Sequence, residues 1–374
     1  MSDHGSAEAP VREALIVAGG RGTRLQPLTH DVPKPLLPFC GPPFLEGLIR
    51  RLGAAGVQRV HLVIGADAAP FQTLRGPAQR HGIELRVVPE PQPLDTAGGA
   101  RAVAASMDGP VLVLNGDILT DVDFAGVATR HVAAGADATM VLTRVADTSA
   151  YGVALREASR VVRFVEKPAP GSLPGHDTVN AGTYVLQPHV LLAHPEGPLS
   201  FERDVFPGLV EGGGHLEGIV WQGVWADLGT PQRYREGHWL ALCGAVEWPT
   251  VRDVPERGGG VRVAEDAQVH PRAHLIGPLL VLGGARVAAG ATVGPHTVLG
   301  RAATVSSGAV VERAILHDRV RIDQRVLARG LLAGHDAHVQ AGARLGADVV
   351  LGSGEVVARG ETVPDRGRRP APRG

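Results

Sequence analysis

Three glycines, an arginine and a lysine near the start of the chain form a pattern suited to binding phosphate groups. Gly19, Gly20 and Gly22 leave the main-chain N–H groups open to a ligand, because no side chain stands in the way. Arg24 follows with a forked, permanently charged donor set. Lys34 stands between two prolines, which stiffen the backbone that carries its ammonium group. The pattern favours a nucleotide or its polyphosphate as ligand.

This stretch matches neither of the two common phosphate-binding loops. No Gly-Lys-Ser/Thr sequence follows it, and Leu25 stands where the third glycine of a dinucleotide fingerprint would be. Glycines alone would leave an ordinary turn as the simpler interpretation. The combination with Arg24 and Lys34 favours the phosphate site.

Asp117 is a candidate ligand for a divalent cation. Asp117 follows the apolar run 111–114, so it is expected at the carboxyl end of a strand. A hard carboxylate oxygen there suits Mg²⁺, which takes one or two carboxylates together with substrate phosphates. The structural alternative for Asp117 is an ordinary turn aspartate after a strand.

Around these candidates the sequence predicts strands that alternate with helices. An apolar run over 14–18 precedes the glycine loop, and a helical pattern over 44–55 is followed by apolar runs over 60–64 and 83–88. This order predicts a mainly parallel α/β sheet. Ligands of such sheets bind beyond the carboxyl ends of the strands, where the glycine loop and Asp117 are expected.

The second half of the chain contains an internal repeat of six residues. An aliphatic residue recurs at that spacing from Val263 to Val311 and again from Val339 to Val363, with a phase slip around 315–332. A period of six matches neither a helix nor a plain strand, but it is typical of the hexapeptide β-helix. The six histidines of this region have no recognisable partner in the sequence and are interpreted as solvated or turn residues.

Composition limits the other possibilities. The formal net charge of −1 gives no global field that would attract nucleic acid or a membrane surface. Two cysteines far apart in the sequence, and no basic and apolar leader, suit a cytoplasmic protein. Residues 1–11 and the basic, proline-rich tail 367–374 are expected to be disordered.

The segments GGRGTRLQPLT (19–29) and PKPLLP (33–38) resemble the nucleotide-binding loop of sugar-1-phosphate nucleotidyltransferases. The resemblance implies a Rossmann-like nucleotidyltransferase domain over 11–245, a linker over 246–262 and a left-handed parallel β-helix over 263–365. The layout most resembles mannose-1-phosphate guanylyltransferases, which implies GTP and mannose 1-phosphate as substrates. Glucose-1-phosphate enzymes that use UTP, dTTP or ATP share much of it, and the sequence does not settle the choice.

The same resemblance implies roles for individual residues. The expected nucleotide-binding residues are Ala18, Gly19, Gly20, Gly22, Thr23, Arg24, Lys34, Thr96 and Gly98. The expected sugar-phosphate residues are Gly152, Glu166, Lys167 and Asn180. Asp117 and Asp227 would share one Mg²⁺, and the residues expected to carry catalysis are Arg24, Lys34, Asp117, Lys167 and Asp227.

Some of these assignments have weaker support from the residues themselves. Glu166 and Lys167 alone would be interpreted as a surface ion pair. Asp95 or Thr96 alone would be interpreted as the cap of the helix that follows, and Asp227 alone as a helix N-cap. Asp95 stands where the family has glycine in its base-reading segment. The β-helix is expected to join like chains into a homo-oligomer. An acyltransferase that uses a β-helix histidine and a non-catalytic regulatory subunit are the alternatives from other classes.

Overall fold

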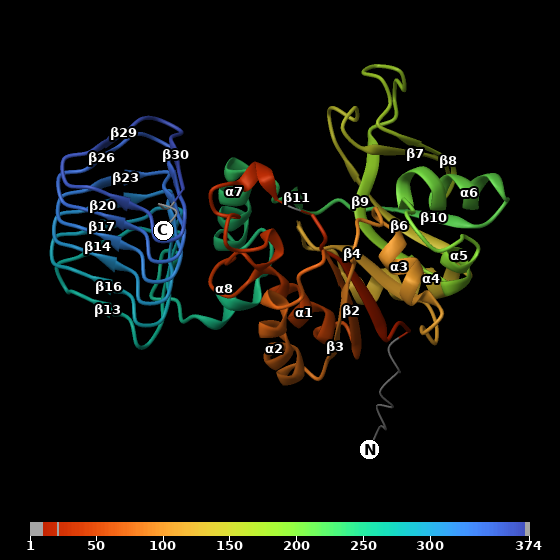
Figure 1. Cartoon of the computed structure of the whole chain (residues 1–374), viewed down its shortest axis with the longest axis horizontal. Helices are drawn as coiled ribbons and strands as arrows, with labels where there is room; N and C mark the ends of the chain where they lie inside the picture. Colours follow the sequence, from red (N-terminus) through yellow and green to blue (C-terminus); the bar gives the residue numbers. More distant parts are fainter. Residues whose placement is uncertain (1–9, 21, 371–374) are drawn as a thin grey trace. The chain divides into compact units, whose positions relative to one another are not determined.

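The computed structural model describes residues 10–20 and 22–370, and these form two compact units. The first unit comprises Met1–Gly20 and Leu48–Trp225, and the second comprises Arg21–Gly47 and Ala226–Gly374 (Figure 1). Helix α1 (Phe44–Ala54) begins in the second unit and ends in the first. No helix within the described ranges is long and apolar enough to cross a membrane.

The first unit is built on one nine-stranded sheet in the order β3-β2-β1-β4-β9-β6-β10-β8-β7. Its strands are β1 (Glu13–Val17), β2 (Arg59–Ile64), β3 (Glu84–Pro89), β4 (Val111–Asn115), β6 (Ala138–Arg144), β7 (Gly152–Glu157), β8 (Arg160–Glu166), β9 (Thr178–Leu186) and β10 (Leu216–Val220). Strands β1 to β4 run parallel, and β8 and β9 are antiparallel to their neighbours. The predicted mainly parallel α/β sheet is therefore confirmed.

Apolar side chains from the sheet and its helices form the core of this unit. Leu15, Val113, Met140 and Tyr184 are fully buried in it. The helical segments are η3 (Pro70–Leu74), α2 (Arg75–Arg80), α3 (Gly98–Ala104), α4 (Phe124–Ala134), α5 (Pro188–Leu192), the π-helical turn η4 (Phe201–Val205) and α6 (Phe206–Glu211). A short strand, β5 (Ile118–Thr120), follows β4, and Asp123 caps α4 by accepting from Gly126 N at 3.0 Å.

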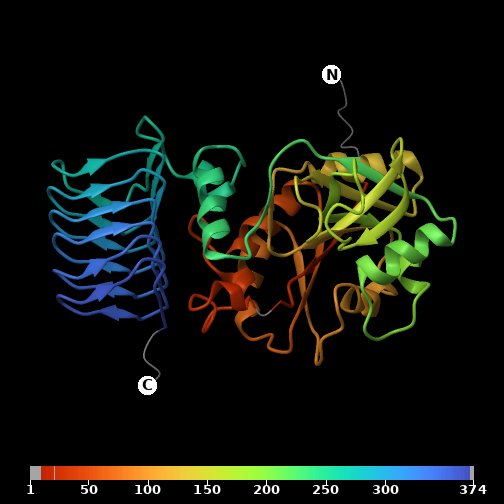
Figure 2. The same cartoon turned by 90° about the horizontal axis from the view of Figure 1, so that it is seen from above.

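The second unit contains a left-handed parallel β-helix, shown in blue-green to blue in Figures 1 and 2. Its longest face has the order β12-β15-β18-β21-β24-β27-β30, from β12 (Val261–Val263) to β30 (Arg368–Arg369). The strands between are β13 (Gln268–Val269), β14 (His274–Leu275), β15 (Leu279–Val281), β16 (Arg286–Val287), β17 (Thr292–Val293), β18 (Thr297–Leu299), β19 (Thr304–Val305), β20 (Val310–Glu312), β21 (Ile315–Leu316), β22 (Arg321–Ile322), β23 (Leu327–Arg329), β24 (Leu332–Ala333), β25 (His338–Val339), β26 (Arg344–Leu345), β27 (Val350–Leu351), β28 (Val356–Val357) and β29 (Thr362–Val363).

The six-residue repeat places one aliphatic side chain on each face of every coil. Val263 stacks on Val281 of the next coil, and Val281 stacks on Leu299, with all three buried. The phase slip has a simple cause, because Val298 pairs with Ile315, and Ile315 with Leu332, at a spacing of 17 residues. Two coils are therefore one residue shorter than the 18-residue coils around them.

Two expectations about the chain ends were wrong within the described residues. Val11 is buried, so the expected disordered arm does not reach it. Arg368 and Arg369 form β30, which pairs with β27, and Arg369 bonds Glu355 and Glu361. Residues 1–9 and 371–374 lie outside the described residues.

The segment before α1 and helix α7 (Pro231–Leu242) share an aromatic cluster in the second unit. The cluster consists of Phe39, Phe44, Tyr234, His238 and Trp248, with Trp248 stacked on Phe44 at a centroid distance of 5.2 Å. A short helix, α8 (Pro249–Asp253), follows Trp248 within the predicted linker. The predicted domain boundaries at 245 and 263 stay a prediction.

Contacts from α7 to the β-helix hold the second unit together. The Tyr234 hydroxyl lies 3.1 Å from His317 Nε2, and the Trp239 indole N–H donates to the carbonyl of His296 at 3.0 Å. Arg235 donates to the carbonyl of Gly330 at 3.0 Å. His317 is buried, so its interpretation as a solvated or turn histidine was wrong. His317 is buried because it packs against α7, and a repeat pattern gives no sign of that contact.

Gly47 in α1 is required by the aromatic cluster. A Cβ at this position would lie 2.2 Å from Cζ2 of Trp248, which real Cβ contacts do not reach. Gly47→Ala should therefore lower the free energy of unfolding by about 1–3 kcal/mol, measured by urea unfolding. Gly76→Ala in α2 is the matched control, because its Cβ would meet the nearest atom at 3.7 Å. Equal stability of the two variants would contradict the packing argument.

Buried His238 gives the fold a pH dependence of known sign. Burial lowers the pKa of His238 to about 4, and its Nδ1 is 2.8 Å from the carbonyl of Tyr234. The unfolded pKa is near 6.5, so the neutral form stabilises the fold fully above that pH. As pH falls from 6.5 toward 4 we expect a loss of up to about 3 kcal/mol. His238→Asn keeps an N–H donor without titrating, so its stability should fall less with acid than that of the natural protein.

Candidate active site

The glycine loop and the Asp117 segment meet at the carboxyl ends of β1 and β4. Ala18 N donates to the carbonyl of Val63 at 2.8 Å, and Gly116 N donates to the carbonyl of Val17 at 2.8 Å. A Cβ on Gly116 would lie 3.1 Å from the Cβ of Ala18. Parallel pairing of β1 with β4 thus brings Asp117 beside the start of the glycine loop, as the strand-end argument predicted.

Glu90 is a candidate site residue that the sequence analysis missed. It follows β3 and is 9% exposed, and its Oε1 is buried without a hydrogen-bond partner. A Cβ on Gly99 would lie 2.4 Å from that oxygen, and a Cβ on Gly19 would lie 3.6 Å from Oε2. Desolvation raises the pKa of Glu90, while the N–H groups of Leu94 and Gly99 counteract it. The strand-end argument used for Asp117 applies equally to Glu90 and would have found it.

Asp95 and Thr96 are held by the segment around η4. Asp95 adopts φ +63 and bonds Arg203, which accounts for a position where the family has glycine, because aspartate tolerates the left-handed region. Thr96 Oγ1 donates to Glu202 at 2.7 Å and accepts from Phe201 N at 2.9 Å. Neither side chain caps α3, whose N-cap residue is Ala97, so the capping alternative was wrong. Thr96 and Gly98 therefore remain candidates for backbone contacts to a nucleotide.

The expected sugar-phosphate residues lie on the neighbouring strands β7, β8 and β9 or, for Lys167, directly after β8. Gly152 pairs with Glu166, and a Cβ on Gly152 would lie 2.8 Å from Glu166 Oε2, which is buried without a partner. Lys167 Nζ is 3.3 Å from Glu166 Oε1 and its side chain is 64% exposed. Asn180 follows Val179, which pairs with Val153 of β7. The four residues therefore gather at one part of the sheet.

Asn180 also has a local structural role. Its Nδ2 donates to the Tyr184 hydroxyl at 2.6 Å, and its Oδ1 accepts from Gly182 N at 2.8 Å. Gly182 has φ +70, and a Cβ there would lie 2.5 Å from Asn115 Nδ2. The bend at Asn180 thus packs against the residue that ends β4, two positions before Asp117.

In the second unit, three cations surround the carboxylate of Asp227. Lys34 Nζ is 3.8 Å from Oδ1, Arg24 Nη2 is 3.8 Å from Oδ2, and Arg233 Nη1 donates to Oδ2 at 3.0 Å. Asp227 ends strand β11 (Trp225–Asp227), and Arg233 lies in the first turns of α7. The sequence analysis missed Arg233, and its place six residues after Asp227 at a helix start was the only signal.

The local backbone explains how these groups come together. Gly22 has φ +62, and a Cβ there would lie 2.7 Å from the Cβ of Lys34, so only glycine lets the lysine pass. Gly22 leads into the short turn η1 (Thr23–Leu25), which begins at Thr23 and carries Arg24, and Lys34 begins η2 (Lys34–Leu36). Thr230, not Asp227, caps α7 by accepting from Arg233 N. The capping alternative for Asp227 was therefore wrong.

The carboxylates fit a divalent cation in their chemistry. Asp227 Oδ1 is buried and accepts no hydrogen bond, which leaves its lone pairs available to a metal ion. The described residues contain no group of three or more His, Cys, Asp or Glu side chains placed to hold a metal, so substrate phosphates would have to complete the set. Asp117 lies in the first unit and Asp227 in the second, and their sharing of one ion stays a prediction.

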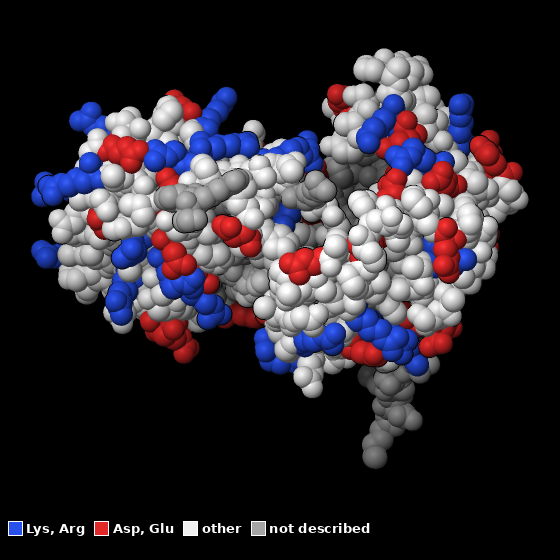
Figure 3. Space-filling model, in the orientation of Figure 1, with Lys and Arg blue, Asp and Glu red and all other residues white. Residues whose placement is uncertain are grey.

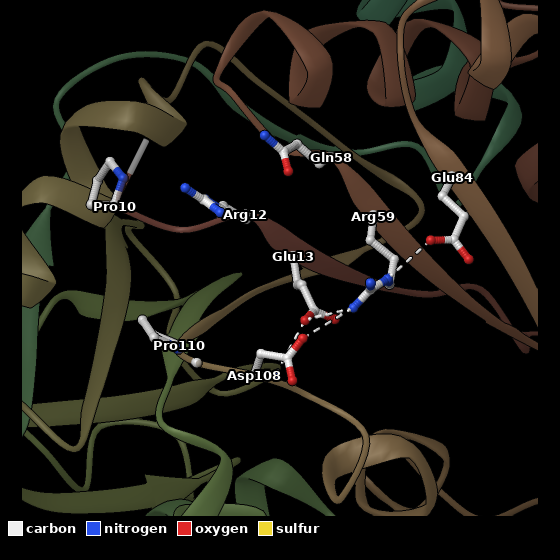
Figure 4. A pocket seen from close by; sticks show the side chains of 9 residues that line it. Pro10, Arg12, Glu13, Gln58, Arg59, Glu84, Asp108 and Pro110 are labelled. Carbon is white, nitrogen blue, oxygen red and sulfur yellow. Dashed lines mark hydrogen bonds and ion pairs between the residues drawn. The ribbon is translucent and has the colours of Figure 1, made fainter. Parts of the chain in front are cut away.

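A separate cavity of about 590 Å³ lies at the amino ends of β1 to β4. Figure 4 shows Arg59 bonded to Glu13, Asp108 and Glu84 there, at N···O distances of 3.0, 3.6 and 3.1 Å. Glu13 is also 2.9 Å from buried His61. Because these carboxylates already bind the arginine, we interpret the cavity as structural. On the face shown in Figure 3, acidic and basic side chains are interspersed, in keeping with the near-zero net charge.

The strand ends of the α/β sheet carry a glycine loop and carboxylates. In the second unit, a lysine and two arginines lie around a further carboxylate. These features are typical of a nucleotide-binding transferase. Residues 13–242 match the family model described as nucleotidyl transferase, so the chain belongs to the nucleotidyl transferase family. This confirms the resemblance seen in residues 19–38.

Comparison with individual proteins shows which members of that family the chain is similar to. The chain is 37% identical over 305 residues to a mannose-1-phosphate guanylyltransferase of Mycobacterium tuberculosis (strain ATCC 25618 / H37Rv), covering 80% of this chain and 83% of the relative. It is 37% identical to the mannose-1-phosphate guanylyltransferase catalytic subunit beta of Danio rerio, covering 62% and 64% respectively. The crystal structure of HddC from Yersinia pseudotuberculosis matches with a TM-score of 0.52 and 26% identity, covering 61% of this chain and 98% of that one.

Lys34 offers a direct test of the charge arrangement. Lys34→Met keeps the apolar stem and removes the ammonium group, so nucleotidyl transfer should slow by about 10²–10³-fold while the fold stays intact. Asp117→Asn should lose a similar factor, because it removes one candidate metal ligand. Steady-state kcat and thermal unfolding would be measured together. A turnover close to that of the natural protein in either variant would refute the assignment of that residue.

Proposed function

We propose that this protein is a mannose-1-phosphate guanylyltransferase, which forms GDP-mannose and pyrophosphate from GTP and mannose 1-phosphate. The proposal rests first on the 37% identity to the Mycobacterium tuberculosis enzyme over most of both chains. The arrangement of Arg24, Lys34 and Arg233 around Asp227 supports it, because this is a charge cluster suited to a polyphosphate.

The chemistry requires alignment and charge neutralisation more than proton transfer. The phosphate of a sugar 1-phosphate is already ionised, so its oxygen attacks the α-phosphorus of the triphosphate without a strong base. Pyrophosphate leaves as the bond to the α-phosphorus breaks. Arg24 and Lys34 would hold the triphosphate and stabilise the charge on the departing group. The partly buried Lys34 is already fixed in place by its 3.8 Å approach to Asp227.

Residues of β7 to β9 would bind the second substrate. Lys167, which is largely exposed next to Glu166, would orient the incoming phosphate. The unpartnered Glu166 Oε2 is a natural acceptor for a sugar hydroxyl. Gly152 gives that carboxylate room, because any side chain there would collide with it. Asn180 would complete this pocket.

Asp117 and Asp227 would hold Mg²⁺. Bound there with the phosphates, the ion would neutralise the charge that builds up during transfer. Both carboxylates have the hard oxygen atoms that Mg²⁺ prefers, and Oδ1 of Asp227 has no competing hydrogen bond.

Glu90 supports guanine as the base. Its Oε1 is buried without a hydrogen-bond partner next to Gly99, and its Oε2 lies near Gly19. A carboxylate accepts hydrogen bonds only, and guanine offers two adjacent donors on its Watson–Crick edge. Uracil and thymine offer one donor between two acceptors, so they would leave a buried carboxylate oxygen facing a carbonyl.

We also propose an organisation for the whole chain. A catalytic domain over 11–245 would be joined through 246–262 to the β-helix over 263–365, and the β-helix would join like chains. Cys40 and Cys243 are free thiols, which suits a reducing compartment such as the cytoplasm.

A pyrophosphate-release screen tests the activity. GTP, ATP, UTP and dTTP would each be combined with mannose 1-phosphate and glucose 1-phosphate in the presence of Mg²⁺. GTP with mannose 1-phosphate should give the highest kcat/KM. A higher value with glucose 1-phosphate and another nucleotide would overturn the substrate assignment. Binding of GDP-mannose without pyrophosphate release from any pair would indicate a regulatory protein.

Glu90→Gln tests the choice of base separately. The amide turns one acceptor into a donor that opposes guanine, so kcat/KM for GTP should fall by about 10–100-fold. Activity with UTP or dTTP should be unchanged or higher. Glu84→Gln makes the same charge change at the other end of β3, where Glu84 is exposed, and it should leave both values unchanged. An equal fall for all nucleotides in Glu90→Gln would contradict a role in base selection.

A further inference from the structure

The last coil of the β-helix touches the turn that carries Arg24. Arg368 Nη1 donates to the carbonyl oxygen of Arg24 at 3.2 Å and to that of Gln26 at 3.2 Å. Arg368 lies in β30, next to β27, and both the arginine and the turn belong to the second unit. The contact joins residues 342 and 344 positions apart in the sequence.

The other carbonyl groups of this turn already have backbone donors. Gly22 O accepts from Leu25 N, Thr23 O from Gln26 N, and Leu25 O from Leu28 N. Within the described residues, no backbone N–H donates to the carbonyl of Arg24 or Gln26.

Proline explains one of the two missing bonds. In a 3₁₀ turn the carbonyl of Arg24 would accept from the residue three positions later, which is Pro27 and has no N–H. Arg368 donates to both carbonyl groups, and a cation is also favourable at the carboxyl end of a helical turn.

A neighbouring arginine fixes the strand from which Arg368 projects. Arg369 Nε bonds Glu355 Oε1 at 3.1 Å, and Arg369 also bonds Glu361. Glu355 is 3% exposed, so this pair is anchored in the β-helix. Successive side chains of a strand point to opposite faces, so Arg369 binds the coil itself and leaves Arg368 to face the turn.

We propose that Arg368 is a positioning residue, which orders the Thr23–Gln26 turn so that Arg24 meets the triphosphate in a fixed place. The proposal rests on the proposed function, because it takes the nucleoside triphosphate as the ligand of Arg24. It makes the β-helix part of nucleotide binding, through one side chain that touches no substrate.

Arg368→Ala tests this with two measurements on the full chain. Hydrogen–deuterium exchange of the peptide covering residues 22–28 should rise, because two carbonyl groups lose their donor. The KM for GTP should rise about tenfold, with the KM for mannose 1-phosphate and the unfolding temperature unchanged. Arg368→Lys, which keeps a charged donor, should restore part of the GTP affinity.

Arg359→Ala is the matched control, since it removes the same charge from an exposed site of the terminal coils. Exchange at 22–28 equal to that of this control would overturn the proposal, whatever the substrate. So would increased exchange with no change in the KM for GTP, or a parallel rise in both KM values with a lower unfolding temperature. If the natural protein releases no pyrophosphate from GTP, the proposed function fails. The exchange measurement then still decides whether Arg368 orders the Thr23–Gln26 turn.

Discussion

A carboxylate surrounded by three cations is the interaction on which the second unit depends. Asp227 has one oxygen near Arg24 and Arg233 and the other near Lys34, and its side chain is largely withdrawn from solvent. A carboxylate in that position is costly unless opposite charge lies nearby. The three cations come from three segments, η1, η2 and α7, so the interaction holds these segments together. The same cations are suited to phosphate oxygens, and stability and ligand binding therefore draw on one set of charges.

Strand ends could be located from the sequence because burial and turn residues leave a local pattern. The apolar run before Asn115 fixed the place of Asp117, and the period of six fixed the aliphatic ladder of the β-helix. The same rules could have found Glu90, which follows a strand as Asp117 does. The structure adds that Gly19 and Gly99 lie against the carboxylate of Glu90, which makes Glu90 a candidate for the nucleotide site.

Other features depend on contacts that leave no local pattern. The bond from Thr96 to Glu202 joins residues 106 positions apart, and the pairing of Arg233 with Asp227 needs the actual path of the chain into α7. The tail 367–374 was expected to be disordered because it is basic and rich in proline. Pairing of β30 with β27 and the two acidic partners of Arg369 outweigh that composition. Composition describes average behaviour, whereas a stacked coil offers the next strand a ready-made edge.

The contact between Arg368 and the Thr23–Gln26 turn limits the number of coils that the β-helix can have. Successive rungs of a parallel stack lie about 4.8 Å apart, which exceeds the span of a hydrogen bond. The stack is held at earlier rungs by Trp239, Arg235 and Tyr234, so adding or removing one whole coil after them would carry the terminal arginine out of reach. Solenoids usually tolerate gain or loss of repeats during evolution, since each repeat contacts only its neighbours. Here the length of the stack is constrained, because its last coil must reach a turn that lies outside the β-helix.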